Sequence, residues 1–378
     1  MMDIPSISVG LELEANVIDM ITGHPILNFN HSEFEECANF IKSQGFYQLQ
    51  TEFDAATLEI GTLPYSNIGD AFLDLDNYFK VLNSYLFQKG YLLLLMGLHL
   101  GRNSEEFIVT KSYSDLKSCM AENGESLYHC GFQINFGMSI DDIEYILPMC
   151  QWLQIYMWPL SIITQSSPIF SNKNTNYMSY RLRLNDYISG SRTGLLPTDI
   201  HDLEAFQHYY KHLPNQNSLS RNCTWFDILP KPILENHQIC GYRIEVRVAD
   251  TSELSKLLIF SQAMILTFLS LYKQLKSDQS LPNLDNRWYI LNRDSVLKNG
   301  KNAILTPDGQ AFYSVEDFLR VIWRPLIAEY SLYLGMNIED LITELLKNSR
   351  SEEMILLFEN MSGLEIARHY AFQDFKKS

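Results

Sequence analysis

The chain has 378 residues and a formal net charge of −16, because 45 Asp and Glu residues outnumber 29 Lys and Arg residues. This charge argues against a general nucleic-acid binder, which needs a basic surface to displace counterions from phosphates. It does not exclude a nucleotide, since a few placed arginines and Mg²⁺ suffice to bind ATP. With 46% hydrophobic and 20% charged residues, the composition is typical of a soluble globular protein.

Neither the N-terminus nor the apolar stretches indicate a membrane protein. The first residues, MMDIPSISVG, lack the basic region and the long apolar run of a signal peptide. Apolar stretches such as Tyr91–Leu98 and Ile155–Ile163 are much shorter than the roughly 20 residues of a membrane span. The six cysteines have no Cys-x-x-Cys spacing, which is typical of reduced thiols rather than a zinc site. We therefore expect a cytoplasmic protein.

Apolar residues at helical spacing predict six helices. The first has Ser32 three residues before Glu35, the spacing of an N-terminal capping box. Two stretches rich in Asn, Ser and Gly predict long loops, at about Asn172–Pro197 and at Leu213–Arg221. In chain order, the predicted helices are Ser32–Gln44, Ile68–Lys89, Ile140–Ile163, Ser252–Gln274, Ser314–Leu334 and Ile338–Lys347.

Short runs that alternate between apolar and polar residues lie between the helices and predict strands. Helices and strands do not alternate regularly, and no glycine-rich turn leads from a strand into a helix, so neither a Rossmann fold nor a P-loop is indicated. We predict an α+β fold with a largely antiparallel sheet, in one elaborated domain over residues 1–378. The predicted strands are Ile7–Glu14, Thr57–Ile60, Leu94–Leu100, Gly131–Gly137, Met178–Leu184 and Tyr242–Val248.

The predicted strands share an unusual polar face. Residues two apart lie on the same face of a strand, so Glu12 and Glu14 stand side by side behind an apolar face. Across the six runs the polar face carries Glu, His, Gln, Asn and Arg, but no Lys. Clustered carboxylates suit Mg²⁺, and arginine forks suit phosphate. The pattern favours a concave face that handles magnesium and phosphate, with an ordinary solvated face as the alternative.

Five sequence blocks resemble, in order and spacing, the glutamate–cysteine ligase and carboxylate–amine ligase families of the glutamine-synthetase-like superfamily. The resemblance is spread over Gly10–Trp288, and residues 294–378, expected to be a helical C-terminal part, match only loosely. It implies a curled, mainly antiparallel sheet of about six strands with helices on its outer face, and it implies ATP and Mg²⁺ as cofactors. The blocks are Gly10–Glu14, Thr51–Pro64, Cys130–Gly137, Ser166–Thr193 and Tyr242–Asp250.

The resemblance implies metal-binding carboxylates in three of the blocks. Glu12 and Glu14 match the paired metal-binding glutamates of the first strand, and Glu245 matches the glutamate of a Glu-x-Arg strand. The second block has acidic residues at the two matching positions, Glu52 and Glu59. The implied metal ligands are therefore Glu12, Glu14, Glu52, Glu59 and Glu245.

The resemblance also implies contacts to the nucleotide and to the phosphoryl group that is transferred. Gln133 and Asn135 lie in the third block, where relatives have His or Gln and then His or Asn. Arg192 lies in a predicted loop, where it is either part of a lid that closes over the substrate or a solvated surface charge. The implied catalytic residues are Arg247 and Arg181 or Arg183, and the implied cofactor-binding residues are Gln133, Asn135, Arg247 and Arg192.

The activity implied by the resemblance is the ATP-dependent formation of an amide bond through an acyl phosphate. Glutamate is the expected acid, through its γ-carboxyl, and cysteine, another amino acid or an amine is the expected acceptor. The expected partners are small-molecule substrates, without nucleic acid or membrane, and the composition allows a homo-oligomer. Two alternatives stay open: a phosphoryl-transfer enzyme such as a guanidino kinase, and a non-catalytic or partner-activated binding module.

Overall fold

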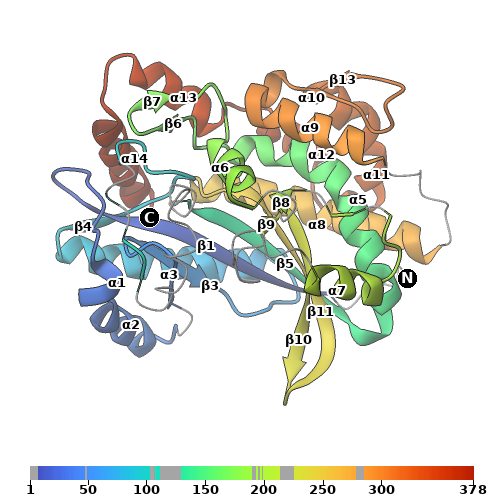
Figure 1. The fold of residues 1–378 in the computed structure, drawn as a ribbon, viewed down its shortest axis with the longest axis horizontal. Coiled ribbons are helices and arrows are strands. Elements are labelled where there is room, and N and C mark those ends of the chain that lie inside the picture. Colours follow the sequence, from blue (N-terminus) through green and yellow to red (C-terminus); the bar gives the residue numbers. More distant parts are fainter. Residues whose placement is uncertain are drawn as a thin grey trace.

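The computed structural model of the chain describes residues 7–46, 49–102, 106, 108–110, 129–189, 193–194, 196–197, 199–212, 225–277 and 285–378. Over these residues the centre of the molecule is a curled antiparallel sheet of seven strands (Figure 1). The strand order is β10-β11-β5-β1-β3-β2, and β4 pairs with the C-terminal part of β1. The strands are β1 (Ser8–Asp19), β2 (Leu49–Thr51), β3 (Thr57–Gly61), β4 (Tyr91–Leu94), β5 (Gly131–Ser139), β10 (Ile228–Glu235) and β11 (Gln238–Asp250).

Three long helices cover the apolar face of this sheet. Helix α3 (Ile68–Gln88) packs against β1, β3 and β4, and α5 (Ile143–Ser161) packs against β10 and β11. Helix α8 (Leu254–Lys276) packs against both α3 and α5. Phe268 of α8 stacks on Phe136 of β5 with 4.4 Å between the ring centroids. The main hydrophobic core therefore lies between these helices and the sheet, as the predicted α+β class with outer helices requires.

The C-terminal helices cover a second apolar cluster beside β4. Helices α13 (Arg350–Phe358) and α14 (Gly363–Lys377) contribute Met354, Ile366 and Tyr370, among others, to this cluster. A buried ion pair joins the two helices, since the Arg350 guanidinium donates to the Asp374 carboxylate. Arg350 also donates to the carbonyl of Leu95 at 2.7 Å. The end of the chain is thereby attached to the sheet.

Local sequence signals set the ends of several elements. The Asn67 side chain accepts a hydrogen bond from the Asp70 amide at 2.9 Å and caps the start of α3. Asn236 and His237 both have positive φ in the tight turn between β10 and β11, which matches the twist of the paired strands. The other elements are α1 (Phe29–Ser32), α2 (Phe34–Ser43), α6 (Tyr180–Ser189), α7 (Leu203–Lys211), α9 (Asn286–Asn299), α10 (Val315–Asp317), α11 (Arg324–Tyr333), α12 (Ile338–Leu345) and the short strand pairs β6 (Ile169–Phe170) with β7 (Lys173–Asn174), β8 (Thr193–Gly194) with β9 (Trp225–Phe226), and β12 (Ile304–Leu305) with β13 (Tyr313–Ser314).

All six predicted helices are present, but the predicted capping box is wrong. Ser32 is the last residue of α1, and α2 follows Glu33, whose side chain makes no capping hydrogen bond. The reason is tertiary: the Asn30 side chain donates to the carbonyls of Asp54 and Thr57 and holds α1 apart as a separate turn. The helix predicted over residues 314–334 runs through α10, a π-helical segment and α11.

Two of the six predicted strands are wrong. The strand predicted at Leu94–Leu100 ends at its first residue, because the chain leaves the ladder where the Gly97 amide donates to Ser166 Oγ at 2.8 Å. The segment predicted as the strand Met178–Leu184 belongs largely to helix α6. Its apolar residues are two apart because Leu182 packs in the main core while Leu184 packs in a separate small cluster.

The predicted loop at 172–197 is wrong to the extent that it contains α6, and the loop predicted at 213–221 lies outside the described residues.

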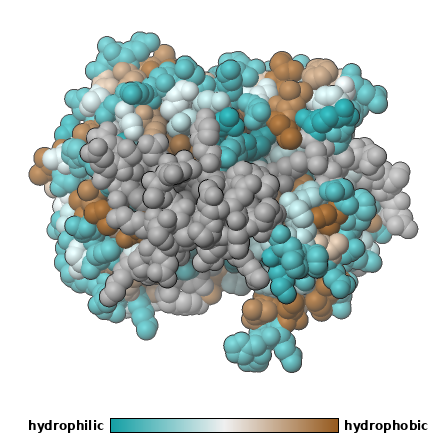
Figure 2. Space-filling model, in the orientation of Figure 1, coloured by the Kyte–Doolittle hydropathy of each residue, from teal (hydrophilic) through white to brown (hydrophobic). Residues whose placement is uncertain are grey.

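Two segments, Ile140–Thr164 and Leu254–Lys276, are long and apolar enough to span a membrane by composition. The share of their most apolar window that is buried inside the protein is 83% and 67%, respectively. Both pack against the sheet or against each other, which explains their apolar character as core helices. Figure 2 shows that most of the described surface in view is hydrophilic, and the protruding β10–β11 hairpin carries the exposed apolar residues Leu234 and Ile239.

Candidate active site

The polar residues of the site come from neighbouring strands in register. β1 lies between β5 and β3, and Glu14 of β1 stands directly opposite Glu59 of β3. Directly opposite residues of an antiparallel pair point to the same face with their Cβ atoms about 5 Å apart. On the same face Glu12 is opposite Gln133 of β5, and Asn135 is opposite Glu245 of β11. The strand alternation predicted for these four strands is therefore confirmed, in β11 as far as Val246.

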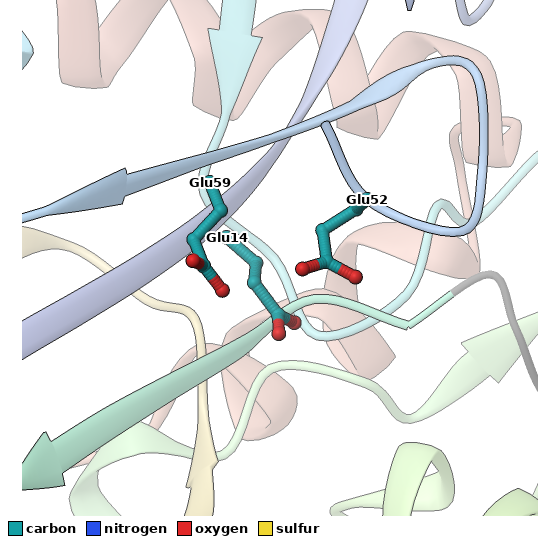
Figure 3. Close-up of side chains that lie close together, drawn as sticks. All are labelled: Glu14, Glu52 and Glu59. Carbon is teal, nitrogen blue, oxygen red and sulfur yellow. The ribbon is translucent and has the colours of Figure 1, made fainter. Parts of the chain in front are cut away.

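Three of the predicted metal ligands form one cluster. Glu14, Glu52 and Glu59 each offer a carboxylate oxygen, and the three oxygens lie within 4.8 Å of one another. Figure 3 shows the three carboxylates turned toward a common centre, with Glu14 and Glu59 on adjacent strands and Glu52 just beyond β2. Burial and mutual repulsion raise the pKa of Glu52 to about 8, and they raise the pKa of Glu59 well above its usual value. A divalent cation would remove this repulsion, so the donor set fits Mg²⁺.

Glu12 and Glu245 lie outside this cluster and have cationic neighbours. The Lys231 ammonium is 2.6 Å from Glu245, and the Arg243 guanidinium is 3.4 Å from Glu245 and 3.5 Å from Glu12. Although burial opposes ionisation, Arg247 and Lys231 hold the pKa of Glu245 below its usual value. The pKa of Glu12 is raised by burial and by the charge of Glu245. The structure therefore joins three of the five predicted ligands and places the other two beside basic side chains.

Gln133 and Asn135 hold carboxylates in place. Gln133 Nε2 donates to Glu14 Oε1 at 3.1 Å, and Asn135 Nδ2 donates to Glu12 Oε1 at 3.2 Å. The amide of Gly131 donates to the other oxygen of Glu14. These bonds orient the acidic side chains, and contact of Gln133 or Asn135 with a nucleotide stays a prediction.

Helix α6 separates the two predicted arginines. Arg181 is buried and lines a small pocket together with Glu14, His129 and Arg247. Arg183 NH1 is 3.3 Å from Asp186 on the same helix, and its side chain is 35% exposed. Because residues two apart diverge around a helix, only Arg181 joins the carboxylate cluster. Arg192 lies outside the described residues.

Arg247 connects the acidic and basic parts of the site. Its Nε is 3.3 Å from Glu245 Oε1. Burial raises the pKa values of Glu12, Glu14 and Glu52, and the charge of Arg247 offsets part of this rise. Together with Arg181 it supplies guanidinium groups beside the carboxylate cluster. This arrangement can bind a divalent cation and an anionic phosphate side by side.

Two further residues of the site were missed by the sequence analysis. The side chain of His129 is 8% exposed, and its Nδ1 is 4.0 Å from Glu14 Oε2. Burial of the imidazole, followed by the charges of Arg181 and Arg247, lowers its pKa to about 3. Asp250 is buried and accepts hydrogen bonds from Arg181 and three serine groups. Asp250 ends the fifth sequence block, and His129 directly precedes the third. Their places in those blocks were the available signal.

The sequence profile described as glutamate-cysteine ligase family 2 matches residues 8–299. The chain belongs to this family. The assignment to a ligase family, expected from the five sequence blocks, is therefore confirmed. The matched residues include β1, β3, β5 and β11, so they hold every described residue of the carboxylate cluster and both arginines beside it.

Relatives of this family member share about a fifth to a quarter of its sequence. "Putative glutamate--cysteine ligase 2" of Roseiflexus castenholzii is 23% identical over 209 residues, which are 54% of this chain and 52% of the relative. "Putative glutamate--cysteine ligase 2-2" of Rhodococcus jostii is 24% identical over 322 residues, which are 80% of this chain and 81% of the relative. The match thus spans about half of the first relative and about four fifths of the second.

Solved structures show the same fold at low sequence identity. The glutamate–cysteine ligase of Francisella tularensis, solved in complex with AMP, has a TM-score of 0.68 and 15% identity, covering 100% of this chain and 89% of its own. The bifunctional glutathione synthetase of Pasteurella multocida has a TM-score of 0.65 and 14% identity, covering 98% of this chain and 53% of its own. The predicted curled antiparallel sheet with outer helices is confirmed by these neighbours and by the strand order.

Proposed function

We propose that this family member is an ATP- and Mg²⁺-dependent carboxylate–amine ligase. In this proposal glutamate is the acid, activated at its γ-carboxyl, and an amino acid such as cysteine or another amine is the acceptor. The observation that carries the proposal is the cluster of Glu14, Glu52 and Glu59 beside the guanidinium groups of Arg181 and Arg247. This combination of carboxylates and arginines suits a magnesium-bound triphosphate.

The reaction needs phosphate activation because a carboxylate has no adequate leaving group for attack by an amine. A carboxylate oxygen attacks the γ-phosphorus of ATP, the bond from phosphorus to the ADP oxygen breaks, and an acyl phosphate forms. The amine then attacks the acyl carbon, inorganic phosphate leaves, and the amine nitrogen loses a proton. The work left to the protein is mainly positioning and neutralisation of charge.

The residues of the chain divide this work. Glu14, Glu52 and Glu59 would hold Mg²⁺, which when bound supplies charge neutralisation at the phosphate oxygens. Arg247 and Arg181 would bind the oxygens of the phosphoryl group, where negative charge must be stabilised during transfer. We propose that Gln133 orients the Glu14 carboxylate for this purpose, since its side-chain amide holds one of the two oxygens.

The chemistry suggests the setting in which the protein works. A reaction that consumes ATP and free amino acids fits the cytoplasm, and we propose this location together with small-molecule substrates. We also propose that residues 1–378 act as one domain, since the C-terminal helices pack on the same sheet as the family-matched residues.

A hydroxylamine trap tests the proposed activity. Hydroxylamine is small enough to replace an unknown acceptor amine, so the purified protein is incubated with ATP, Mg²⁺, hydroxylamine and each common amino acid or dicarboxylate. We expect γ-glutamyl hydroxamate, detected by its mass, and none when ATP or Mg²⁺ is left out. A Glu59→Gln variant should form no hydroxamate, whereas Glu36→Gln, which changes an exposed glutamate paired with Lys89, should act like the unchanged protein.

The outcomes separate the proposal from its alternatives. Hydroxamate from another acid would keep the ligase and replace glutamate as the substrate. No hydroxamate from any acid, by protein that is stabilised thermally by ATP and Mg²⁺, would contradict the ligase and favour phosphoryl transfer to another acceptor. Neither hydroxamate nor nucleotide binding would favour a non-catalytic binding module.

A further inference from the structure

Asp250 reaches the active-site side of the sheet through an irregularity in β11. The pairing of β11 with β5 shifts by one residue between Val246, which is opposite Ile134, and Ala249, which is opposite Phe132. This β-bulge reverses the alternation, so Asp250 stands opposite Gly131 and shares its face with Gln133. Without the bulge Asp250 would follow Val246 onto the apolar face. A charged group is thereby placed in the polar layer that holds Glu14.

Asp250 is buried and each of its carboxylate oxygens accepts two hydrogen bonds. Oδ2 accepts from the Ser166 amide at 3.0 Å and from Ser167 Oγ at 2.7 Å. Oδ1 accepts from Ser179 Oγ and from Arg181 Nε, both at 2.8 Å. These donors come from the segment that leads into β6 and from the residues around the start of α6. A buried carboxylate whose oxygens are paired in this way restrains its four donors relative to one another.

The same bonds leave one end of the Arg181 guanidinium facing the site. Nε is held by Asp250, and NH2 donates to the carbonyls of Arg247 at 3.1 Å and Ala249 at 2.8 Å. NH1 points toward Gly131, where an added Cβ would lie 3.0 Å from NH1 and 3.5 Å from Glu14 Oε2. The three described groups that accept hydrogen bonds from the guanidinium therefore all belong to the last residues of β11.

The Asp250 carboxylate is closely packed against Gly97. A Cβ added to Gly97 would lie 2.7 Å from the carboxylate carbon of Asp250. Ser167 Oγ, which donates to Asp250, also accepts from the Arg181 amide at 3.3 Å. The backbone and the side chain of Arg181 are thus both tied to one carboxylate.

We propose that Asp250 is a positioning residue for the phosphoryl-transfer site, holding the Arg181 guanidinium so that NH1 is directed at the carboxylate cluster. Its charge compensates that of Arg181, and its two oxygens fix the start of α6 relative to β11. An arginine fixed in advance loses less conformational entropy when it binds a phosphoryl group. The catalytic effect of Asp250 rests on the proposed ligase activity, whereas its hydrogen bonds to Arg181 do not depend on that activity.

The first test is the Asp250→Asn variant in the hydroxamate assay. The asparagine can still accept from Arg181 Nε, but its amide nitrogen then faces the donors of Ser166 and Ser167, so the group must rotate or move. We expect kcat to fall by about 100-fold, the size reported for losing one donor to a transition state, with a smaller change in KM. We expect Asp250→Asn combined with Arg181→Lys to be no slower than Arg181→Lys alone, because both changes remove the same interaction.

The matched control breaks an equally buried ion pair away from the site. Asp374→Asn removes the partner of Arg350 between α13 and α14, so it should lower the unfolding temperature and leave kcat unchanged. If Asp250→Asn does not fold, Ser167→Ala replaces it, because this variant removes one donor to Asp250 and the acceptor of the Arg181 amide while keeping the charge. We then expect a kcat several-fold lower.

A second readout does not depend on activity. In protein labelled with ¹⁵N-arginine, the Nε–H signal of Arg181 is assigned by its loss in Arg181→Lys. We expect this signal to be protected from solvent exchange, to shift or lose protection in Asp250→Asn or Ser167→Ala, and to stay in place in Asp374→Asn.

The results distinguish the two proposals. If the unchanged protein forms no hydroxamate, the proposed function fails, and the Arg181 signal alone decides whether Asp250 holds this side chain. An Arg181 signal that is the same with and without Asp250, a normal kcat in Asp250→Asn, or losses that multiply in the double variant would each overturn the assignment of Asp250.

Discussion

Among the described basic residues of the site, Arg247 interacts electrostatically with the largest number of acidic side chains. Its Nε is 3.3 Å from Glu245. Burial raises the pKa values of Glu12, Glu14 and Glu52, and the charge of Arg247 offsets part of this rise. Arg181 reaches the same pocket from α6. Guanidinium groups differ from an ammonium in offering two parallel donors to a phosphate. The fork, rather than the charge alone, is the property that we expect the site to need.

We therefore expect Arg247→Lys to lower kcat in the hydroxamate assay by about 100-fold, because a lysine keeps the charge and loses the paired donors. The comparison variant is Arg183→Lys, whose side chain is directed at Asp186 and should leave kcat within about twofold of normal. If Arg183→Lys lowered kcat as much as Arg247→Lys, the position assigned to α6 relative to the carboxylate cluster would be wrong. If Arg247→Lys had a normal kcat, Arg247 would not belong to the phosphate site.

At the scale of single elements, β1 carries out two tasks on its two faces. Leu11 and Leu13 are buried in the main core, while Glu12 and Glu14 face the site from the positions between them. Period-two alternation makes these tasks separable by substitutions only one residue apart.

The prediction for β1 is a division between stability and activity. Leu11→Ala leaves a cavity between the sheet and its helices, so it should lower the free energy of unfolding by about 2–5 kcal/mol, as measured by unfolding in urea. The kcat of the folded variant, measured without urea, should be unchanged. Glu12→Gln, one residue further, should keep the stability and lower kcat. Loss of activity in folded Leu11→Ala, or loss of folding in Glu12→Gln, would contradict the assignment of the two faces.

The alternation of β11 is interrupted, and this interruption marks the limit of pattern-based prediction for a strand. Arg243 and Glu245 follow the predicted polar face, but the bulge after Val246 carries Asp250 to that face as well. The sequence alternation alone predicts the apolar face for Asp250. Bulges arise from pairing with the neighbouring strand, which is information from the tertiary structure.

At the scale of the whole molecule, the buried ionisable groups predict how stability varies with pH. Burial raises the pKa values of Glu12, Glu14, Glu52 and Glu59, the value for Glu52 reaching about 8. These groups keep their protons in the folded state when the unfolded chain has already lost them, so stability falls as pH rises from about 4.5 through about 8. His129 has the opposite effect, since its folded pKa of about 3 costs stability as pH falls below its usual value of 6.5.

Burial also lowers the pKa of His99 to about 4, so His99 and His129 act in the same direction, and their effect ends about one pH unit above their usual pKa of 6.5. Above about pH 7.5 the buried carboxyl groups therefore determine the trend. We expect the unfolding temperature of protein kept in EDTA to fall from about pH 7.5 through about pH 8.5, in scanning calorimetry or dye fluorescence. Mg²⁺ should raise the unfolding temperature more at pH 8 than at pH 6.5, because it binds the ionised cluster. In Glu59→Gln, the unfolding temperature should vary less with pH in EDTA, and the effect of Mg²⁺ should differ less between the two pH values. An unfolding temperature that rises with pH in EDTA would contradict the geometry of the cluster.

Much of the fold was predictable from local patterns. The six helices and four of the strands follow from apolar periodicity, because burial of one face imposes a repeat on the sequence that is independent of the partner. The Glu12 and Glu14 pair, Glu59 and the Glu245-x-Arg247 strand could be named as candidates for the same reason, with the family resemblance supplying their roles.

Local patterns specify the composition of the polar face: which carboxylates, amides and arginines are present, and on which strands they alternate with the core. Which of these groups come into contact depends on how distant segments of the chain pack together. Register pairs Glu14 with Glu59, a helix in place of a predicted strand separates Arg181 from Arg183, and the β11 bulge brings Asp250 beside Arg181. These contacts depend on hydrogen bonds and packing between segments distant in the chain, which no local periodicity encodes.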